Sequence, residues 1–416
     1  MSREDALARD AADPLAAFRG SVVRHDPELI YLDGNSLGML PVATRDRLAH
    51  VIDDEWGGEL IRGWHHWFDL PRAVGDRLGT TLLGADAGQV LVCDTITVNL
   101  FKLAWAAMAA RPGRRVIVTD ARNFPTDRYV LQGVAEHRGG SVRFVDTDPV
   151  HGIDAGTLAD ALDDDVALVE LSHVDYRSGA LADLPALTRL VHDCGALMLW
   201  DLAHSAGAVT VDLDQHGVDL AVGGSYQYLN AGPGAPGVLY VNRPLVEQLE
   251  SPIRGWWGQR DPFDMDLPYQ PAPGIARFLS GSQSVPGLYA VDSGIDSLET
   301  AGLPALRAKS MALTSYLVDL ADEWLVPLGF QLRSPRDPQR RGGHVVLAHP
   351  DAHRIGVAAV RDALVVPDVR PPDLIRLAPV PLTTSYTDVY DGLMRIRELV
   401  AAGGHEAHDV SSLRVT

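Results

Sequence analysis

The segment ALMLWDLAHSAG, residues 196–207, decides the interpretation of the fold. Its first five residues form a continuously apolar run, which is typical of a strand covered on both faces of a parallel sheet. Asp201 ends the run, and His204 follows three residues later, where we expect a helix to begin. An acid here can simply cap that helix. It can also lie at the carboxyl end of the strand, where doubly wound α/β proteins bind their ligands.

Short β-rich runs alternate with helical patterns on both sides of this segment, between about residues 85 and 245. Each run is continuously apolar, as expected for strands with helices on both faces. The pattern predicts a doubly wound α/β domain with a mostly parallel sheet. The predicted strands are RVIVT (115–119), VRFV (142–145), VALVEL (166–171), ALMLW (196–200), DLAV (219–222) and GVLYV (237–241), and the helical stretches are 97–110, 126–138 and 184–194.

The pattern changes after about residue 285, where the predicted helices become longer. We expect three parts: an N-terminal segment (1–45) that packs on the small domain, a large α/β domain (46–285) and a smaller α+β domain (286–416). No internal repeat or low-complexity linker separates them. The C-terminal part has helical patterns near 287–300, 304–326 and 385–401, and strand candidates at 344–349 and 374–379.

The composition excludes several kinds of partner. The 416 residues are 46% hydrophobic and 22% charged, with a formal net charge of −19 and a pI of about 5.1. This acidic balance argues against nucleic acid and against an anionic membrane surface. No apolar run approaches the roughly 18 residues of a membrane span, and the polar N-terminus MSREDALARDAAD lacks the apolar core of a signal peptide. We therefore expect a soluble, cytoplasmic protein.

Cysteine and lysine are used sparingly. Cys93 and Cys194 lie in or beside apolar segments, and we expect two buried, reduced thiols. The adjacent His65 and His66 diverge on any regular element, and nothing else has zinc spacing, so we expect no metal. Lysine is almost absent, with only Lys102 and Lys309 in the whole sequence.

The segment AVGGSYQYLNAGPGAPGVLYV, residues 221–241, carries the second signal. A glycine-rich crossover loop would explain it on its own. The stretch from Ser225 to Asn230 nevertheless resembles the Ser-Tyr-Lys-Tyr-Leu-Asn motif of the kynureninase family, in which the lysine holds pyridoxal phosphate through an imine. This chain has Gln227 in the place of that lysine.

The resemblance extends over nearly the whole chain. It implies a pyridoxal-phosphate enzyme with the aspartate-aminotransferase-like fold and a homodimer whose site is shared between subunits. One departure besides Gln227 is Gln259, where family members usually carry histidine. The matching segments are YLDGNSLGMLP (31–41), IRGWHHWFDLP (61–71), DTITVNLFKL (94–103), NFPTDRY (123–129), SHVDYRSGAL (172–181), GWWG (255–258), RFLSGSQ (277–283) and IRLAPVPLTTSYTDVY (375–390).

The resemblance implies which residues bind the cofactor's phosphate. Ile96 would contribute its backbone N–H and Thr97 its hydroxyl, at a helix N-terminus that suits an anion. Trp256 would donate its indole N–H, and Ser282 would contribute its hydroxyl and backbone across the dimer interface.

The resemblance also places residues around the cofactor's ring. Phe124 would stack on the pyridine, with Asp127 hydrogen-bonded nearby and Ser172 and His204 beside the cofactor. Asp201 would face the ring nitrogen and keep it protonated, because a protonated pyridinium is what makes pyridoxal phosphate an electron sink. Without the neighbouring matches, a Phe-Pro pair such as 124–125 would be a loop anchor in the core.

The substrate in this family is L-kynurenine or its 3-hydroxy form, which is hydrolysed to an anthranilate and L-alanine. The resemblance implies that Ser36 lies near the substrate, Trp64 near its aromatic end, and that Arg376 binds its α-carboxylate. An arginine's planar fork suits a carboxylate, although an arginine in an apolar strand can also form a structural ion pair. Tyr226 would assist proton transfer when the Cβ–Cγ bond breaks.

Gln227 changes what this mechanism can do. The family's lysine is needed twice, to hold the cofactor and to move the α-proton. A glutamine has no basic nitrogen and forms no imine, and neither Lys102 nor Lys309 is an obvious replacement. We therefore expect non-covalent pyridoxal phosphate and impaired or altered hydrolysis.

Three interpretations of Gln227 remain open at this stage. The chain is an inactivated variant of a working kynureninase, a homologue that binds or regulates without hydrolysis, or a homologue with different chemistry on an amino acid. A cysteine desulfurase-like enzyme of the same fold is less favoured, because neither cysteine lies in a plausible catalytic loop.

Overall fold

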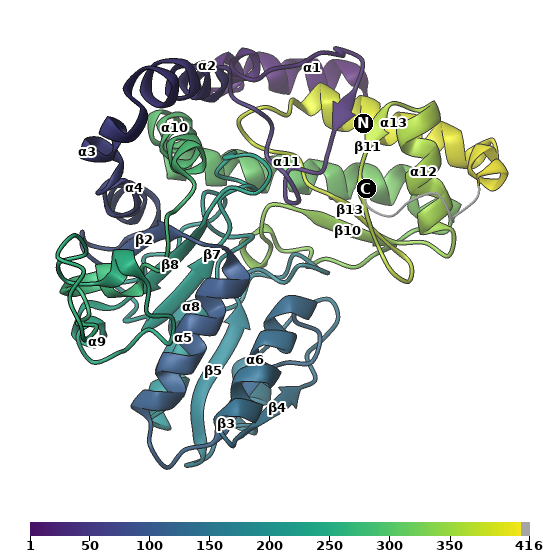
Figure 1. The fold of residues 1–416 in the computed structure, drawn as a ribbon. Helices are drawn as coiled ribbons and strands as arrows, with labels where there is room; N and C mark the ends of the chain where they lie inside the picture. The colour runs from purple at the N-terminus through teal and green to yellow at the C-terminus, as the bar shows by residue number, and fades with distance from the viewer. Residues whose placement is uncertain (409–416) are drawn as a thin grey trace.

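A seven-stranded sheet forms the centre of the larger domain in the computed structural model, which describes residues 1–408 (Figure 1). Its strands lie in the order β2-β8-β7-β6-β5-β3-β4. β8 is antiparallel to both neighbours, and the other pairings are parallel. This arrangement confirms the predicted α/β class. The strands are β2 (Val90–Cys93), β3 (Val116–Asp120), β4 (Ser141–Val145), β5 (Val166–Ser172), β6 (Leu197–Asp201), β7 (Leu220–Gly223) and β8 (Gly237–Val241).

Most helices of this domain begin at a capping side chain or a proline. Thr95 precedes α5, and its hydroxyl accepts a hydrogen bond from the Val98 N–H at 3.3 Å. Pro125 is the first residue of α6, where the missing N–H costs no helical bond. The helices are α2 (Val42–His50), α3 (Trp64–Trp67), α4 (Leu70–Leu78), α5 (Ile96–Ala110), α6 (Pro125–His137), α7 (Ala155–Ala159), α8 (Leu184–Asp193), α9 (Arg243–Val246) and α10 (Val285–Ala301).

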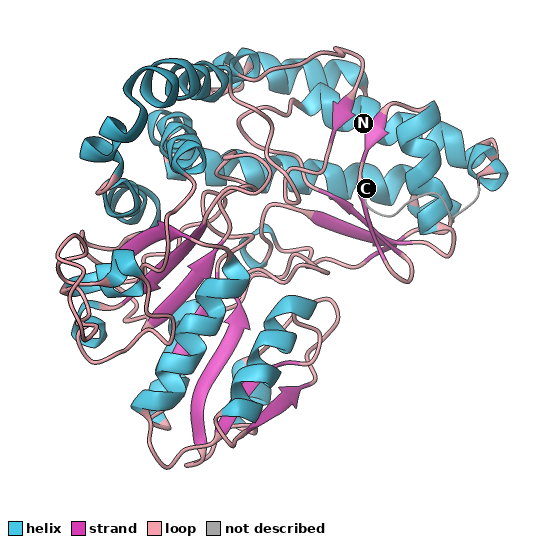
Figure 2. Ribbon diagram, viewed as in Figure 1, coloured by secondary structure: helices cyan, strands magenta, loops and turns pink. Residues whose placement is uncertain are grey.

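Both faces of the sheet are covered, as the continuous apolar runs predict. Successive residues of a strand point to opposite faces. On β6, Leu197 and Leu199 pack in the layer under α5 and α6, whereas Met198 and Trp200 pack in the layer that includes α8. Figure 2 shows the helices lying along the strands. The strand that the sequence did not predict, β2, lies at an edge of this sheet.

The smaller domain contains a four-stranded antiparallel sheet in the order β12-β13-β10-β9. Its longest helix, α11, has 22 residues. Within residues 1–408 no helix combines the length and the apolar character that crossing a bilayer requires. The elements are α11 (Leu303–Trp324), β9 (Gln331–Leu332), β10 (Val345–Ala348), α12 (Ala352–Asp362), β11 (Val365–Val366), β12 (Asp368–Arg370), β13 (Leu374–Leu377) and α13 (Tyr386–Ala401).

The N-terminal segment lies on the smaller domain. Helix α1 (Arg3–Ala11) packs against α13, and β1 (Ile30–Tyr31) pairs in parallel with β11. In contrast, α10 packs on α2 and α4 and shares a core with the large sheet. The domain boundary at residue 285 stays a prediction. If domains are defined by this packing, α10 belongs to the large domain.

The segment after β6 corrects one expectation, because His204 does not begin a helix. The Ala203 N–H donates to the Asp201 carboxylate at 2.8 Å, and Ser205 and Ala206 each donate a backbone N–H to the Leu202 carbonyl. Gly207 then adopts a φ of +81°, a left-handed conformation that suits glycine. The chain therefore makes consecutive tight turns here instead of a helix.

Candidate active site

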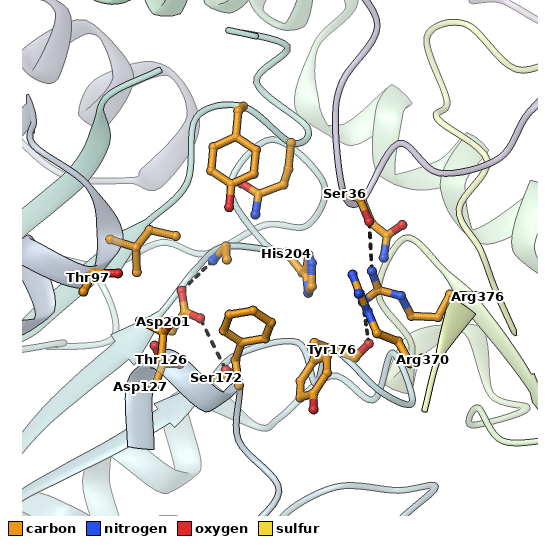
Figure 3. Close-up of a pocket in the computed structure, with 16 residues that line it drawn as sticks. Ser36, Thr97, Thr126, Asp127, Ser172, Tyr176, Asp201, His204, Arg370 and Arg376 are labelled. Carbon is orange, nitrogen blue, oxygen red and sulfur yellow. Dashed lines mark hydrogen bonds between the residues drawn. The ribbon is translucent and has the colours of Figure 1, made fainter. Parts of the chain in front are cut away.

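A cavity of about 220 Å³ lies at the carboxyl ends of β5 and β6, where the two domains meet. Figure 3 shows its side chains converging from the large sheet, from the N-terminal segment and from β12 and β13. All of the predicted site residues line it except Trp64, Trp256 and Ser282. The lining residues are Asn35, Ser36, Ile96, Thr97, Phe124, Thr126, Asp127, Ser172, Tyr176, Asp201, Ala203, His204, Tyr226, Gln227, Arg370 and Arg376.

The N-terminus of α5 forms one end of the cavity. The first N–H groups of a helix have no intrahelical partner and carry the positive end of its dipole. The Thr95 hydroxyl caps only the Val98 N–H, so the backbone N–H groups of Ile96 and Thr97 remain for a ligand. The Thr97 side chain is exposed at the same place. This end of the cavity suits a phosphate.

Aromatic side chains line the wall next to it. Phe124 is 42% exposed although it follows a buried residue, and its ring meets Tyr176 edge-on, with the centroids 5.3 Å apart at 88°. Asn123 Oδ1 accepts the Phe124 backbone N–H at 2.7 Å and fixes this turn. An open aromatic face inside a cavity suits a flat heteroaromatic ring.

Asp201 ends β6 directly beside Ser172, which ends β5. The Ser172 hydroxyl lies 3.4 Å from Asp201 Oδ2 (Figure 3). Burial raises the pKa of Asp201 to about 6. Burial, together with the nearby Asp201 carboxylate, also raises the pKa of Asp127 well above its usual value. An ionised carboxylate this deeply buried needs a cationic partner, and a protonated ring nitrogen is such a partner.

The opposite end of the cavity is cationic. Arg376 is fully buried and ion-pairs with Asp368. Its guanidinium also donates to Ser36 Oγ at 3.0 Å and to the Tyr176 carbonyl at 2.8 Å. Arg370 lies 3.1 Å from the same Asp368 carboxylate. Two guanidinium groups share one carboxylate, so this end suits a carboxylate ligand.

Arg370, Tyr176 and Asn35 are lining residues that the sequence did not identify. Arg370 could have been noticed, because the sequence has Asp368 and Arg370 in alternation shortly before Arg376. In the structure Asp368 is the antiparallel register partner of Arg376. Tyr176 contributes its backbone carbonyl, which has no sequence signature.

Two histidines lie behind this cationic end. His344 is buried and His204 is partly buried, with their ring centroids 5.5 Å apart. Burial and the Arg376 charge lower the pKa of His204 to about 3 and also lower the pKa of His344. Both rings are therefore neutral at pH 7 and add no charge to the site.

Gln227 lines the cavity, follows β7 in the chain and is 5% exposed. Its Oε1 is buried without a hydrogen-bond partner among the described residues. This oxygen packs on Gly224, where a Cβ would lie 2.0 Å from it. An amide in this position neither bonds covalently to an aldehyde nor accepts a proton at neutral pH.

The lysines Lys102 and Lys309 are bound elsewhere. Lys102 lies on α5, is buried, and donates to the Phe278 carbonyl at 2.6 Å and to Asp94. Lys309 pairs with Asp13 at 2.7 Å in the smaller domain. Neither lines the cavity, so within residues 1–408 no lysine occupies the place of the family's lysine.

The three remaining predicted residues lie outside this cavity. Trp64 and Trp256 contact each other edge-on at 5.7 Å in an aromatic cluster that also includes Trp67, Phe68, Trp257 and Phe263. Ser282 lies in the loop before α10, beside Gln283, which accepts the Asp94 N–H at 2.7 Å. Their roles stay predictions that depend on a second subunit.

Comparison with solved structures defines the class of protein. The apo cysteine desulfurase of Thermococcus onnurineus NA1 has a TM-score of 0.78 and 19% identity, over 96% of this chain and 98% of that chain. A C-DES mutant with glycine covalently linked to its pyridoxal-phosphate cofactor has a TM-score of 0.80 and 19% identity, over 89% of this chain and 97% of that chain. This likeness shows the fold, which is that of fold type I pyridoxal-phosphate enzymes.

Comparison of sequences then defines the family. The kynureninase of Pseudomonas fluorescens is 42% identical over 408 residues, which are 96% of this chain and 95% of that protein. The kynureninase of Burkholderia pseudomallei strain K96243 is 42% identical over 407 residues, with the same coverage. The kynureninase C-terminal domain family matches residues 306–396. The chain belongs to the kynureninase family, and its cofactor is pyridoxal phosphate.

Proposed function

We propose that this chain binds pyridoxal phosphate without a covalent bond, together with a kynurenine-type α-amino acid, and that its hydrolytic activity is impaired. The observation that carries the proposal is Gln227, an amide in a cavity whose other groups suit the cofactor and an amino acid. The N-terminus of α5 would bind the phosphate. Phe124 would stack on the face of the ring, and Asp201 would bind the ring nitrogen.

Each remaining part of the reaction would depend on a different residue of this chain. When bound, the cofactor withdraws electrons from the amino acid's α-carbon. Asp201 would keep a proton on the ring nitrogen, Arg376 would orient the α-carboxylate, and Tyr226, the neighbour of Gln227, would move a proton at the substrate. Gln227 accepts no proton, so the α-carbon loses the base that a lysine would supply, a contribution of about 10²–10⁴-fold.

A fold neighbour supports the non-covalent part of this proposal. In the C-DES mutant, which carries alanine in place of a lysine, glycine is covalently linked to the pyridoxal-phosphate cofactor. A fold of this type therefore retains cofactor and amino acid after loss of a lysine. We extend that behaviour to this chain, where the phosphate and carboxylate ends of the cavity provide the binding energy.

A homodimer is part of the same proposal. Large apolar side chains are exposed on two segments that flank the aromatic cluster, and a second copy would remove them from water. Such a copy would also bring Trp256 and Ser282 toward its partner's cavity. We propose that the dimer is cytoplasmic. The exposed side chains are Trp56, Leu60, Ile61, Phe263, Met265 and Leu267.

Cofactor binding tests the proposal. Equilibrium dialysis should show saturable binding of pyridoxal phosphate, and Thr97→Ala should weaken it about tenfold or more, because a hydrogen bond to a charged group contributes about 1.5–3 kcal/mol. The same variant should bind pyridoxal, which lacks the phosphate, as the unaltered chain does. Thr80→Ala, at an exposed threonine of the same domain, is the control. Absence of binding, or equal losses with both ligands, would contradict the proposal.

A further inference from the structure

Glu170 is a fully buried carboxyl behind the ring-nitrogen end of the cavity. It lies on β5 two residues before Ser172, so both side chains point to the same face of the sheet. Thr119 Oγ1 and Asn123 Nδ2 each donate to Glu170 Oε2 at 2.8 Å. Glu170 Oε1 has no partner among residues 1–408. The proposed function assigns no role to this group.

Hydrogen bonds connect Glu170 to Asp201. Asn123, which donates to Glu170, accepts the Ser172 hydroxyl on its Oδ1 at 2.8 Å. The same hydroxyl lies 3.4 Å from Asp201 Oδ2. A change of charge on Glu170 therefore acts on Asp201 both through space and through this chain of polar groups.

Asp127 completes a cluster of three carboxyls. It lies in the first turn of α6, is 1% exposed, and lines the cavity. Burial and the Asp201 charge raise the pKa of its carboxyl, while its Oδ2 is buried without a hydrogen-bond partner in the described chain. A buried acceptor without a donor at a cavity wall indicates that a ligand with a positive or N–H group belongs there.

The groups that face Glu170 are acidic or neutral. The acidic groups are Asp120 from β3, Asp127 from α6 and Asp201 from β6. The neutral groups are Thr119 and Asn123. Helix α5 covers the same face, but its Lys102 is bound to Asp94 and the Phe278 carbonyl. Burial and the Asp201 charge raise the pKa of Glu170 to about 8, so a second negative charge appears in the cluster as the pH rises above neutrality.

We propose that Glu170 is a positioning residue that extends, toward higher pH, the range in which the cavity holds a ring nitrogen in its protonated form. The inference rests on the proposed function, because it takes the ring nitrogen to lie at Asp201. A negative charge near a cationic group favours its protonated state. The protonated ring is the form that withdraws electrons from the α-carbon, and this matters most in a site that has lost its lysine.

The experiment uses 4′-deoxypyridoxine 5′-phosphate, which has the ring nitrogen and the phosphate but no aldehyde. Its bound ring is titrated by ultraviolet absorbance in the unaltered chain and in Glu170→Gln. We expect the loss of the ring proton to shift about one pH unit lower in the variant. Glu136→Gln, at an exposed position of α6, should titrate as the unaltered chain does.

A second variant keeps Glu170 and weakens only its ionised form. Thr119→Val removes one donor to Oε2, so the ring should again titrate at lower pH, by a smaller amount. If Glu170 had only a structural role, its replacement would lower the affinity for the probe or the unfolding midpoint. The pH at which the bound ring loses its proton would then stay unchanged.

The outcomes separate the two proposals. An unchanged titration in Glu170→Gln with the probe bound overturns the inference, as does an unchanged titration in Thr119→Val if Glu170→Gln does not fold. Failure of the unaltered chain to bind the probe instead overturns the proposed function.

Discussion

Replacing Gln227 with lysine is expected to give the chain a covalently held cofactor and to raise kynurenine cleavage by about 10²–10⁴-fold or more. The lysine would supply the amine that the glutamine lacks and a base at the substrate's α-carbon. Gly224 has no side chain against this position, and the adjoining cavity of about 220 Å³ leaves room for the longer chain. Anthranilate fluorescence measures the release of product.

Two control variants test whether the amine of the new lysine causes the gain in cleavage. Gln227→Arg introduces a cation at the same place that forms no imine, and Gln132→Lys introduces a lysine at an exposed position of α6. Both should leave cleavage at its original level. If Gln227→Lys holds the cofactor covalently and still releases no anthranilate, kynurenine is not the substrate and this chain does different chemistry on another amino acid.

Replacing Arg376 with leucine is expected to weaken L-kynurenine binding at least about 100-fold. Each hydrogen bond between charged groups contributes about 1.5–3 kcal/mol, and a guanidinium offers two to a carboxylate. Tryptophan fluorescence quenching measures the affinity. The decarboxylated amine of kynurenine should bind the variant and the unaltered chain equally, and an equal loss for both ligands would contradict the assignment of Arg376 to the carboxylate.

The same variant is expected to lose stability. Removing one partner of a buried ion pair costs about 3–5 kcal/mol, because the remaining charge stays buried. Arg370 lies 3.1 Å from the Asp368 carboxylate and still compensates it, so we expect the lower end of this range. Urea unfolding measures the loss, and Arg376→Lys, which keeps the charge, should lose less.

The sequence predicted most strands of the large sheet, because both faces of this sheet are buried. Strands such as β5 and β6 read as continuous apolar runs, and helices such as α5 end close to their expected bounds. Ser172 and Asp201, which the family resemblance assigns to the cofactor, end these two strands and are neighbours in the sheet.

Other parts of the site depend on tertiary contacts that no local pattern encodes. Arg370 reaches the cavity because β12 pairs with β13, and Tyr176 contributes through a backbone carbonyl. His204 was wrongly expected at a helix start, because Gly207 and the Asp201 carboxylate stabilise turns instead. Glu170 was not identified from the sequence, because it lies in the otherwise apolar run VALVEL, which predicts only a buried strand.

We propose that this member of the kynureninase family holds its cofactor without a covalent bond. Borohydride reduction of the protein loaded with pyridoxal phosphate, followed by intact mass measurement, tests it most directly. We expect an unchanged protein mass for the unaltered chain and the added mass of one reduced cofactor for Gln227→Lys. The same added mass on the unaltered chain, located at Lys102 or Lys309, would contradict it.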